Sequence, residues 1–200
     1  MRTDPAPPVL GGVDLYWLPL GAGGRVVPRF GRAYESVSAW RGHRLAQALF
    51  HSALEVTCDG TVYVVEMAPV WSLPEPDRGV VREGPVGLRP LGALRLFRYE
   101  VRCWAGGRIP DRAWAVGSPR RVGGSDVAAR VLDLVPDVPA LTWGRDELAT
   151  GEMWNSNSLV SWLLASSGVD LRHVVPPLGG RAPGWTAGLA LARPMVGGAW

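Results

Sequence analysis

The sequence contains no lysine, since all 21 of its basic residues are arginine. The arginines are spread among apolar and acidic segments, and the net charge is only +3. Proteins that bind nucleic acids usually carry a basic patch or stripe on one face. The charge pattern therefore predicts no nucleic-acid partner. Arginine in place of lysine, with abundant Gly, Ala, Val, Pro and Trp, is typical of a GC-rich bacterial genome.

Cysteine and histidine are also scarce. The two cysteines, Cys58 and Cys103, form no C-x-x-C pair and no cluster with the three histidines, so neither a zinc site nor another metal site is expected. The sequence also lacks an export signal and any run of about 18 apolar residues that could cross a bilayer. We therefore expect a cytoplasmic protein with no membrane span, reduced thiols and no cofactor.

Two hundred residues, 47% of them hydrophobic, suffice for one substantial core. We expect a flexible N-terminal tail at residues 1–8 and a single α+β domain over residues 9–200, with an antiparallel sheet packed against a few helices. The hydrophobic periodicity and the turn residues predict the following segments. Strands are expected at 13–18, 50–57, 61–68 and 94–104, helices within 32–49 and at 126–134 and 155–167, a loop with at most a short strand at 69–93, and irregular structure or a short strand at 176–200.

The two central strands are predicted to form a hairpin, because Asp59-Gly60 favours a two-residue turn with positive φ at both positions. In that register Cys58 faces Thr61, and His51 and Glu66 lie diagonally on one face. Their Cβ atoms would then be about 7 to 8 Å apart. A carboxylate at that distance could orient the imidazole and raise its basicity, as a general base requires.

The segment Asn155-Ser156-Asn157 begins the most clearly predicted helix, which ends before Gly168. A hydroxyl in the first turn would lie at the positive end of the helix dipole, beside backbone N–H groups that could bind an oxyanion. Asn and Ser are also preferred helix caps, which explains these residues without any activity. His51 could likewise be a hydrogen-bonded core residue, and Glu66 a solvated strand residue.

The strand at 51–56 and the helix start at 155–159 resemble two motifs of the circularly permuted papain-like superfamily, which includes the NlpC/P60, lecithin retinol acyltransferase and PPPDE groups. The resemblance covers about a dozen residues and implies a permuted papain-like fold. The cysteine nucleophile of that superfamily falls on Ser156. Residues 143–147 and 180–185 resemble an actinobacterial family to which no activity is attached.

The resemblance leads to two hypotheses. In the first, a hydrolase or acyl/amide transferase uses Ser156 as nucleophile, His51 as base and Glu66 to orient it, and binds substrate through Asn155 and Asn157. In the second, the same cleft of an inactive module binds a peptide, an acyl chain or a protein, or the chain acts as a scaffold.

A loop rim with Arg181 and Trp185 could contribute to ligand binding in either case, although packing of Trp185 on the core would explain it equally well. The ten tryptophans suggest anchored loops or an interface. The oligomeric state stays open.

Overall fold

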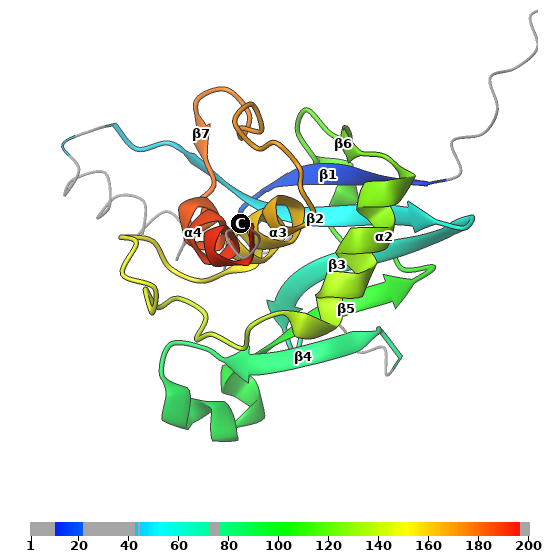
Figure 1. The fold of residues 1–200 in the computed structure, drawn as a ribbon. Coiled ribbons are helices and arrows are strands. Elements are labelled where there is room, and N and C mark those ends of the chain that lie inside the picture. Colours follow the sequence, from blue (N-terminus) through cyan, green and yellow to red (C-terminus); the bar gives the residue numbers. More distant parts are fainter. Residues whose placement is uncertain (1–10, 22–42, 44, 73–76, 197–200) are drawn as a thin grey trace, which may run out of the picture.

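The computed structural model describes residues 11–21, 43, 45–72 and 77–196. These residues form an α+β structure with a mostly antiparallel, open sheet of seven strands (Figure 1). The strand order is β4-β5-β3-β2-β1-β6, and β7 pairs in parallel with the beginning of β2. The strands are β1 (Gly12–Pro19), β2 (Ala48–Cys58), β3 (Thr61–Pro69), β4 (Val80–Pro85), β5 (Arg98–Ala105), β6 (Arg120–Gly123) and β7 (Gly180–Arg181).

Strands β2 and β3 form the predicted hairpin. Asp59 and Gly60 have φ of 48° and 76°, which is the conformation that a tight two-residue turn with right-handed strand twist requires. Cys58 faces Thr61, and the predicted register is confirmed from there to the pair Leu54 and Val65. The ladder between β2 and β3 ends at that pair. The predicted extension to His51 is therefore not observed.

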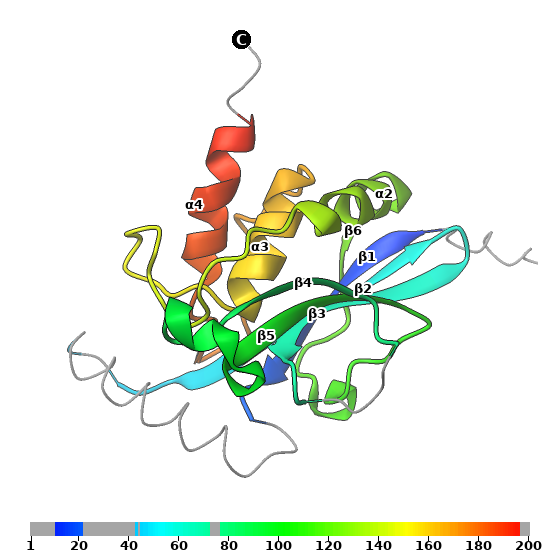
Figure 2. The same cartoon turned by 90° about the horizontal axis from the view of Figure 1, so that it is seen from below.

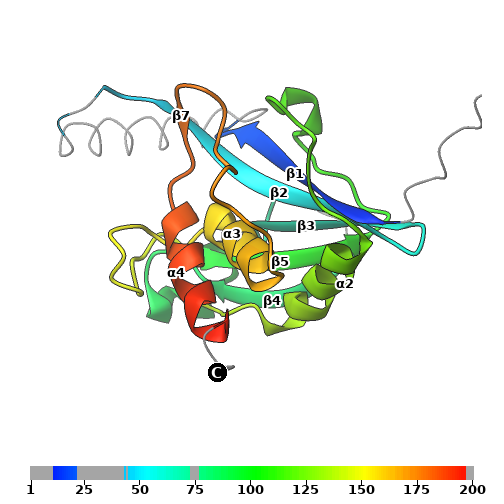
Figure 3. The same ribbon diagram turned by 45° about the horizontal axis from the view of Figure 1, so that its top comes forward.

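Three α-helices are present among the described residues, and all lie on one face of the sheet (Figure 2). They are α2 (Ser125–Leu134), α3 (Ser156–Ser166) and α4 (Trp185–Val196). Helix α2 packs on β1 and β2, α3 packs on β2 and β3, and α4 packs on α3 (Figure 3). Gly168, with a φ of 80°, follows the end of α3 as predicted. No helix in the described part of the chain is long and apolar enough to cross a membrane.

The sheet has two distinct faces, which we call the helix face and the opposite face. The main core lies between the helix face and the helices. Its residues come from most of the described chain, the first being Val13 and the last Ala192. Every residue of α3 from Ser156 to Leu164 is buried, since this helix lies between the sheet and α4. A smaller cluster occupies the opposite face and consists of Tyr16, Leu18, Ala53, Val64 and Ile109.

The structure differs from the sequence-based expectations in three segments. Residues 95–97 form a short 3-10 helix that Leu94 precedes, so β5 begins only at Arg98. The expected helix at 32–49 lies largely outside the described residues, and its last two positions are in β2. The C-terminal segment contains α4, which Gly184, Gly188 and Pro194 obscured in the sequence. The tail at residues 1–8 lies outside the described residues.

Candidate functional site

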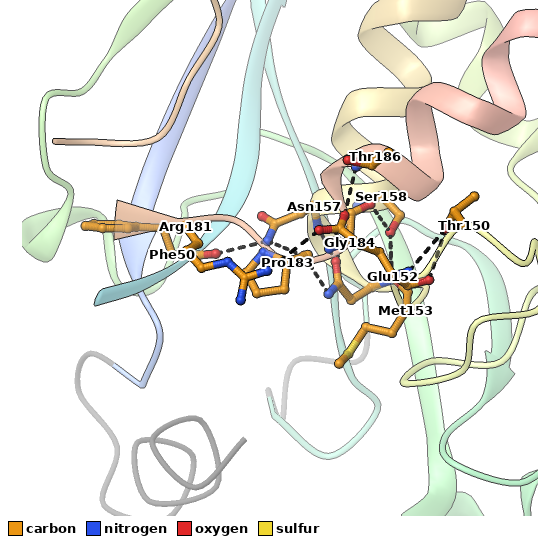
Figure 4. A network of polar contacts seen from close by, with 11 residues as sticks. Phe50, Thr150, Glu152, Met153, Asn157, Ser158, Arg181, Pro183, Gly184 and Thr186 are labelled. Atoms are coloured by element: carbon orange, nitrogen blue, oxygen red, sulfur yellow. Dashed lines mark hydrogen bonds and ion pairs between the residues drawn. The ribbon is translucent and has the colours of Figure 1, made fainter. Parts of the chain in front are cut away.

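The beginning of α3 lies where β2 separates from β3. On the N-terminal side of Leu54, β2 no longer pairs with β3. The first two residues of β2 pair with β7 instead, Ala48 with Gly180 and Leu49 with Arg181. The carbonyl of Phe50 is thereby left without a β3 partner, and the side chain of Asn157 binds it (Figure 4). The predicted helix start is thus brought beside the predicted strand.

Asn155 is the N-cap of α3. Its Oδ1 accepts the backbone N–H groups of Asn157 at 2.9 Å and Ser158 at 3.3 Å, and the Oγ of Ser158 accepts the N–H of Asn155 at 3.1 Å. This is a complete capping box. Two of the N–H groups at the start of α3, those of Asn157 and Ser158, are therefore occupied by the side chain of the N-cap residue.

Asn157 uses all of its polar atoms inside the protein. Its Nδ2 donates to the carbonyls of Phe50 and Pro183, both at 2.9 Å, and its Oδ1 accepts the hydroxyl of Ser52 at 2.9 Å. The residue is only 3% exposed. Asn157 therefore joins β2, α3 and the segment before α4, and none of its hydrogen-bonding groups is available to a substrate.

Glu152 belongs to the same junction, although no pattern in the nearby sequence pointed to it. One oxygen of its carboxylate accepts the backbone N–H groups of Gly184 and Thr186, each at 3.0 Å. A carboxylate at the first turn of α4 also interacts favourably with the positive end of the helix dipole. The guanidinium of Arg181 lies 3.9 Å from the other carboxylate oxygen.

Small residues allow α3 and α4 to approach closely. The hydroxyl of Ser158 donates to the carbonyl of Gly184 at 2.7 Å, and that of Ser161 donates to the carbonyl of Trp185 at 2.8 Å. A Cβ on Gly188 would lie 2.1 Å from the carbonyl oxygen of Ser158. The backbones therefore meet at a distance that only glycine permits.

We call this group of residues the α3–α4 joint; it consists of Glu152, Asn155, Asn157, Ser158, Pro183 and Gly184. Trp185 follows it, and its ring packs against that of Trp17 with centroids 5.1 Å apart. The four predicted binding residues, Asn155, Asn157, Arg181 and Trp185, thus do lie in one region, as does Ser156. Asn155, Asn157 and Trp185 make polar or aromatic contacts that stabilise the fold. Arg181 lies beside the carboxylate of Glu152, which caps α4.

His51 is on the other side of the sheet. Trp17 pairs with Ser52, which bonds to Asn157, and Leu18 pairs with His51. Because side chains alternate along a strand, His51 shares the opposite face with Leu18. Burial lowers the pKa of the His51 imidazole to about 4. The structure therefore separates His51 from Ser156 by the sheet itself.

Glu66 is also engaged elsewhere. Its carboxylate accepts a hydrogen bond from the guanidinium of Arg102 at 2.7 Å, and Arg102 also binds Glu100 and the hydroxyl of Ser72. Arg78 binds Glu100 from the loop before β4. Burial raises the pKa of the Glu66 carboxyl, and Arg102 acts in the opposite direction.

Glu100 and Arg102 alternate with the apolar residues of β5, yet both are fully buried. Two carboxylates and two guanidiniums compensate one another, which allows charges to be buried beneath the loop that follows β3. Glu66 therefore pairs with Arg102, which holds Ser72 of this loop on the sheet, and does not orient His51.

Ser156, the first residue of α3, is 5% exposed, and its hydroxyl forms no hydrogen bond with any described residue. A serine hydroxyl needs an adjacent base to become a nucleophile. Within residues 11–21, 43, 45–72 and 77–196, the structure places neither His51 nor Glu66 in that position. The same residues contain no group of three or more His, Cys, Asp or Glu side chains that could hold a metal ion.

Comparison of the chain with models of protein families, with curated proteins and with solved structures gave no significant match.

Proposed function

We propose that this chain is a binding or scaffold module without hydrolase or transferase activity, with a permuted papain-like order of strand and helix. The observation that supports this most strongly is the position of His51 on the face of the sheet opposite to α3. Without that base, Ser156 has no partner for proton transfer among the described residues. The capping of α3 by Asn155 supports the same conclusion, because it occupies the N–H groups of Asn157 and Ser158.

The papain-like part of the proposal depends on the resemblance of the two motifs and on an antiparallel sheet with α3 packed against β2 and β3. In this proposal the helix start that would carry a nucleophile in an active relative has become a joint between α3 and α4. The polar groups that would otherwise bind substrate hold the C-terminal helix in place. The ligand, whether a peptide, an acyl chain or a protein, would then bind to another surface.

A serine-reactive fluorophosphonate probe tests this proposal. We expect no labelling of Ser156 in the folded protein, as measured by intact mass and peptide mapping. Ser125 gives a matched control, because it is the first residue of α2 as Ser156 is of α3. Labelling that is lost in Ser156→Ala and retained in Ser125→Ala would contradict the proposal and favour the hydrolase hypothesis.

A further inference from the structure

The connection between β4 and β5 extends beyond the edge of the sheet (Figure 1). It contains two short 3-10 helices, η1 (Arg89–Ala93) and η2 (Arg95–Phe97), neither of which has a buried residue. Leu88, Leu94 and Leu96 are 48%, 57% and 66% exposed. We call residues 86–97 the leucine-arginine turn. Three exposed leucines in so short a segment indicate a surface that contacts something outside the fold.

The turn has a defined shape. Backbone hydrogen bonds run from Leu91 to Leu88, from Leu94 to Leu91 and from Phe97 to Leu94, all between 2.9 and 3.0 Å. At its base, Gly87 donates to the carbonyl of Trp143 at 2.9 Å. The leucines are therefore displayed by a pre-formed backbone, and binding through them costs little conformational entropy.

The charge of the turn has one sign. Arg89 and Arg95 are its two charged residues, and it contains no carboxylate. The guanidinium of Arg95 forms no ion pair or hydrogen bond with any described residue, and the side chain of Arg89 is 74% exposed with Glu147 at 3.8 Å. An exposed pair at that distance contributes little, so both guanidiniums can bind an external anion.

A shallow hollow of about 370 Å³ lies beside the turn, lined by Glu83, Gly84, Pro85, Arg89, Gly92 and Arg98. Arg98 is held by Glu83 at 3.0 Å and by the carbonyl of Gly92 at 2.6 Å. Arg89 also lines the hollow, and its ion pair with Glu147 is long and exposed to solvent. The hollow therefore places a cation beside a space that could admit a polar headgroup.

We propose that the leucine-arginine turn docks on an anionic phospholipid surface. Leu88, Leu94 and Leu96 enter the boundary between headgroups and acyl chains, while Arg89 and Arg95 pair with lipid phosphates. Apolar side chains flanked by arginines are the combination that binds such interfaces, and neither component alone is sufficient. The inference deepens the proposed binding function by naming the partner, and it does not depend on Ser156.

Flotation with vesicles tests the proposal. The full chain is mixed with vesicles of phosphatidylcholine alone or of phosphatidylcholine with phosphatidylglycerol, and the bound fraction is measured. We expect binding to the anionic vesicles, weaker binding to the neutral ones, and loss of binding at high salt because salt screens the arginines. Substitution Arg89→Gln or Arg95→Gln should each reduce the partition coefficient about fivefold.

The triple substitution of Leu88, Leu94 and Leu96 by Ala should reduce the partition coefficient by about a hundredfold, because all three side chains leave the interface. The control variant combines Leu178→Ala with Arg108→Gln, two exposed positions in other loops, and should bind like the wild type. All variants should keep the circular dichroism spectrum, because the altered side chains are exposed.

Failure of the wild type to bind anionic vesicles, or unchanged binding of the triple variant, would overturn the proposal. A dimer that the triple substitution dissociates, without vesicle binding, would do so as well, because it would assign the turn to a contact between two copies. These outcomes are independent of the labelling of Ser156, so failure of this inference is distinguishable from failure of the proposed function.

Discussion

Replacement of Asn157 by alanine should destabilise the protein strongly without any catalytic role for the residue. The substitution removes three buried hydrogen bonds, to the carbonyls of Phe50 and Pro183 and from the hydroxyl of Ser52. Each bond contributes about 1 kcal/mol net, and the groups left behind are buried. We therefore expect the free energy of unfolding to fall by about 3 kcal/mol. For a domain of this size that corresponds to a decrease in Tm of about 6 to 12 °C.

Urea denaturation followed by circular dichroism measures this loss. Ser52→Ala removes one of the three bonds and should cost about 1 kcal/mol. Ser156→Ala removes no hydrogen bond to a described residue and should change the stability by less than about 0.5 kcal/mol. A loss below about 1 kcal/mol for Asn157→Ala, or a larger loss for Ser156→Ala, would refute the assignment of Asn157 as the residue that joins β2, α3 and the segment before α4.

Three further predictions concern other parts of the fold. Gly188→Ala should lower stability by about 1 to 3 kcal/mol in thermal unfolding despite its better helix propensity, because the new Cβ would collide with the backbone of α3; an increase in Tm would contradict the close contact. Arg102→Met should cost about 3 to 5 kcal/mol in urea unfolding, because it leaves two carboxylates buried beside one guanidinium; a neutral effect would argue against the buried cluster. The pKa of His51 is about 4 in the folded protein, against the ordinary histidine value of 6.5 that applies to the unfolded chain. The unfolded chain therefore binds the proton more tightly. Stability should therefore fall by up to about 3 kcal/mol as the pH decreases from about 6.5 to about 4, and His51→Gln should remove that component.

The local features of the fold were predictable because their causes lie within a few residues. The Asp59-Gly60 turn sets the register of the hairpin, and Asn155 caps α3 through groups two and three residues away. Gly168 similarly marks the end of α3. In each case the short-range chemistry that the sequence displays is the chemistry that the structure uses.

Long-range partners were not predictable in this way. Glu152 caps a helix that begins more than thirty residues later, and Glu66 finds Arg102 on a strand that is adjacent in space only. The hairpin register put His51 and Glu66 on one face, but it did not indicate which face α3 would cover. The packing of α3 against Ser52 decides that question. Leu94 and Leu96 were expected at the start of the strand at 94–104, and they instead belong to an exposed turn before β5.

The separation of His51 from Ser156 is the central claim, and NMR titration of the His51 imidazole tests it most directly. The side-chain resonances would be followed against pH in the wild type and in Ser156→Ala. We expect a pKa of about 4 in both proteins, because burial on the opposite face sets the value and Ser156 makes no contact with the ring. A pKa near the ordinary 6.5 that moves when Ser156 is replaced would show that the two side chains interact, and would contradict this account.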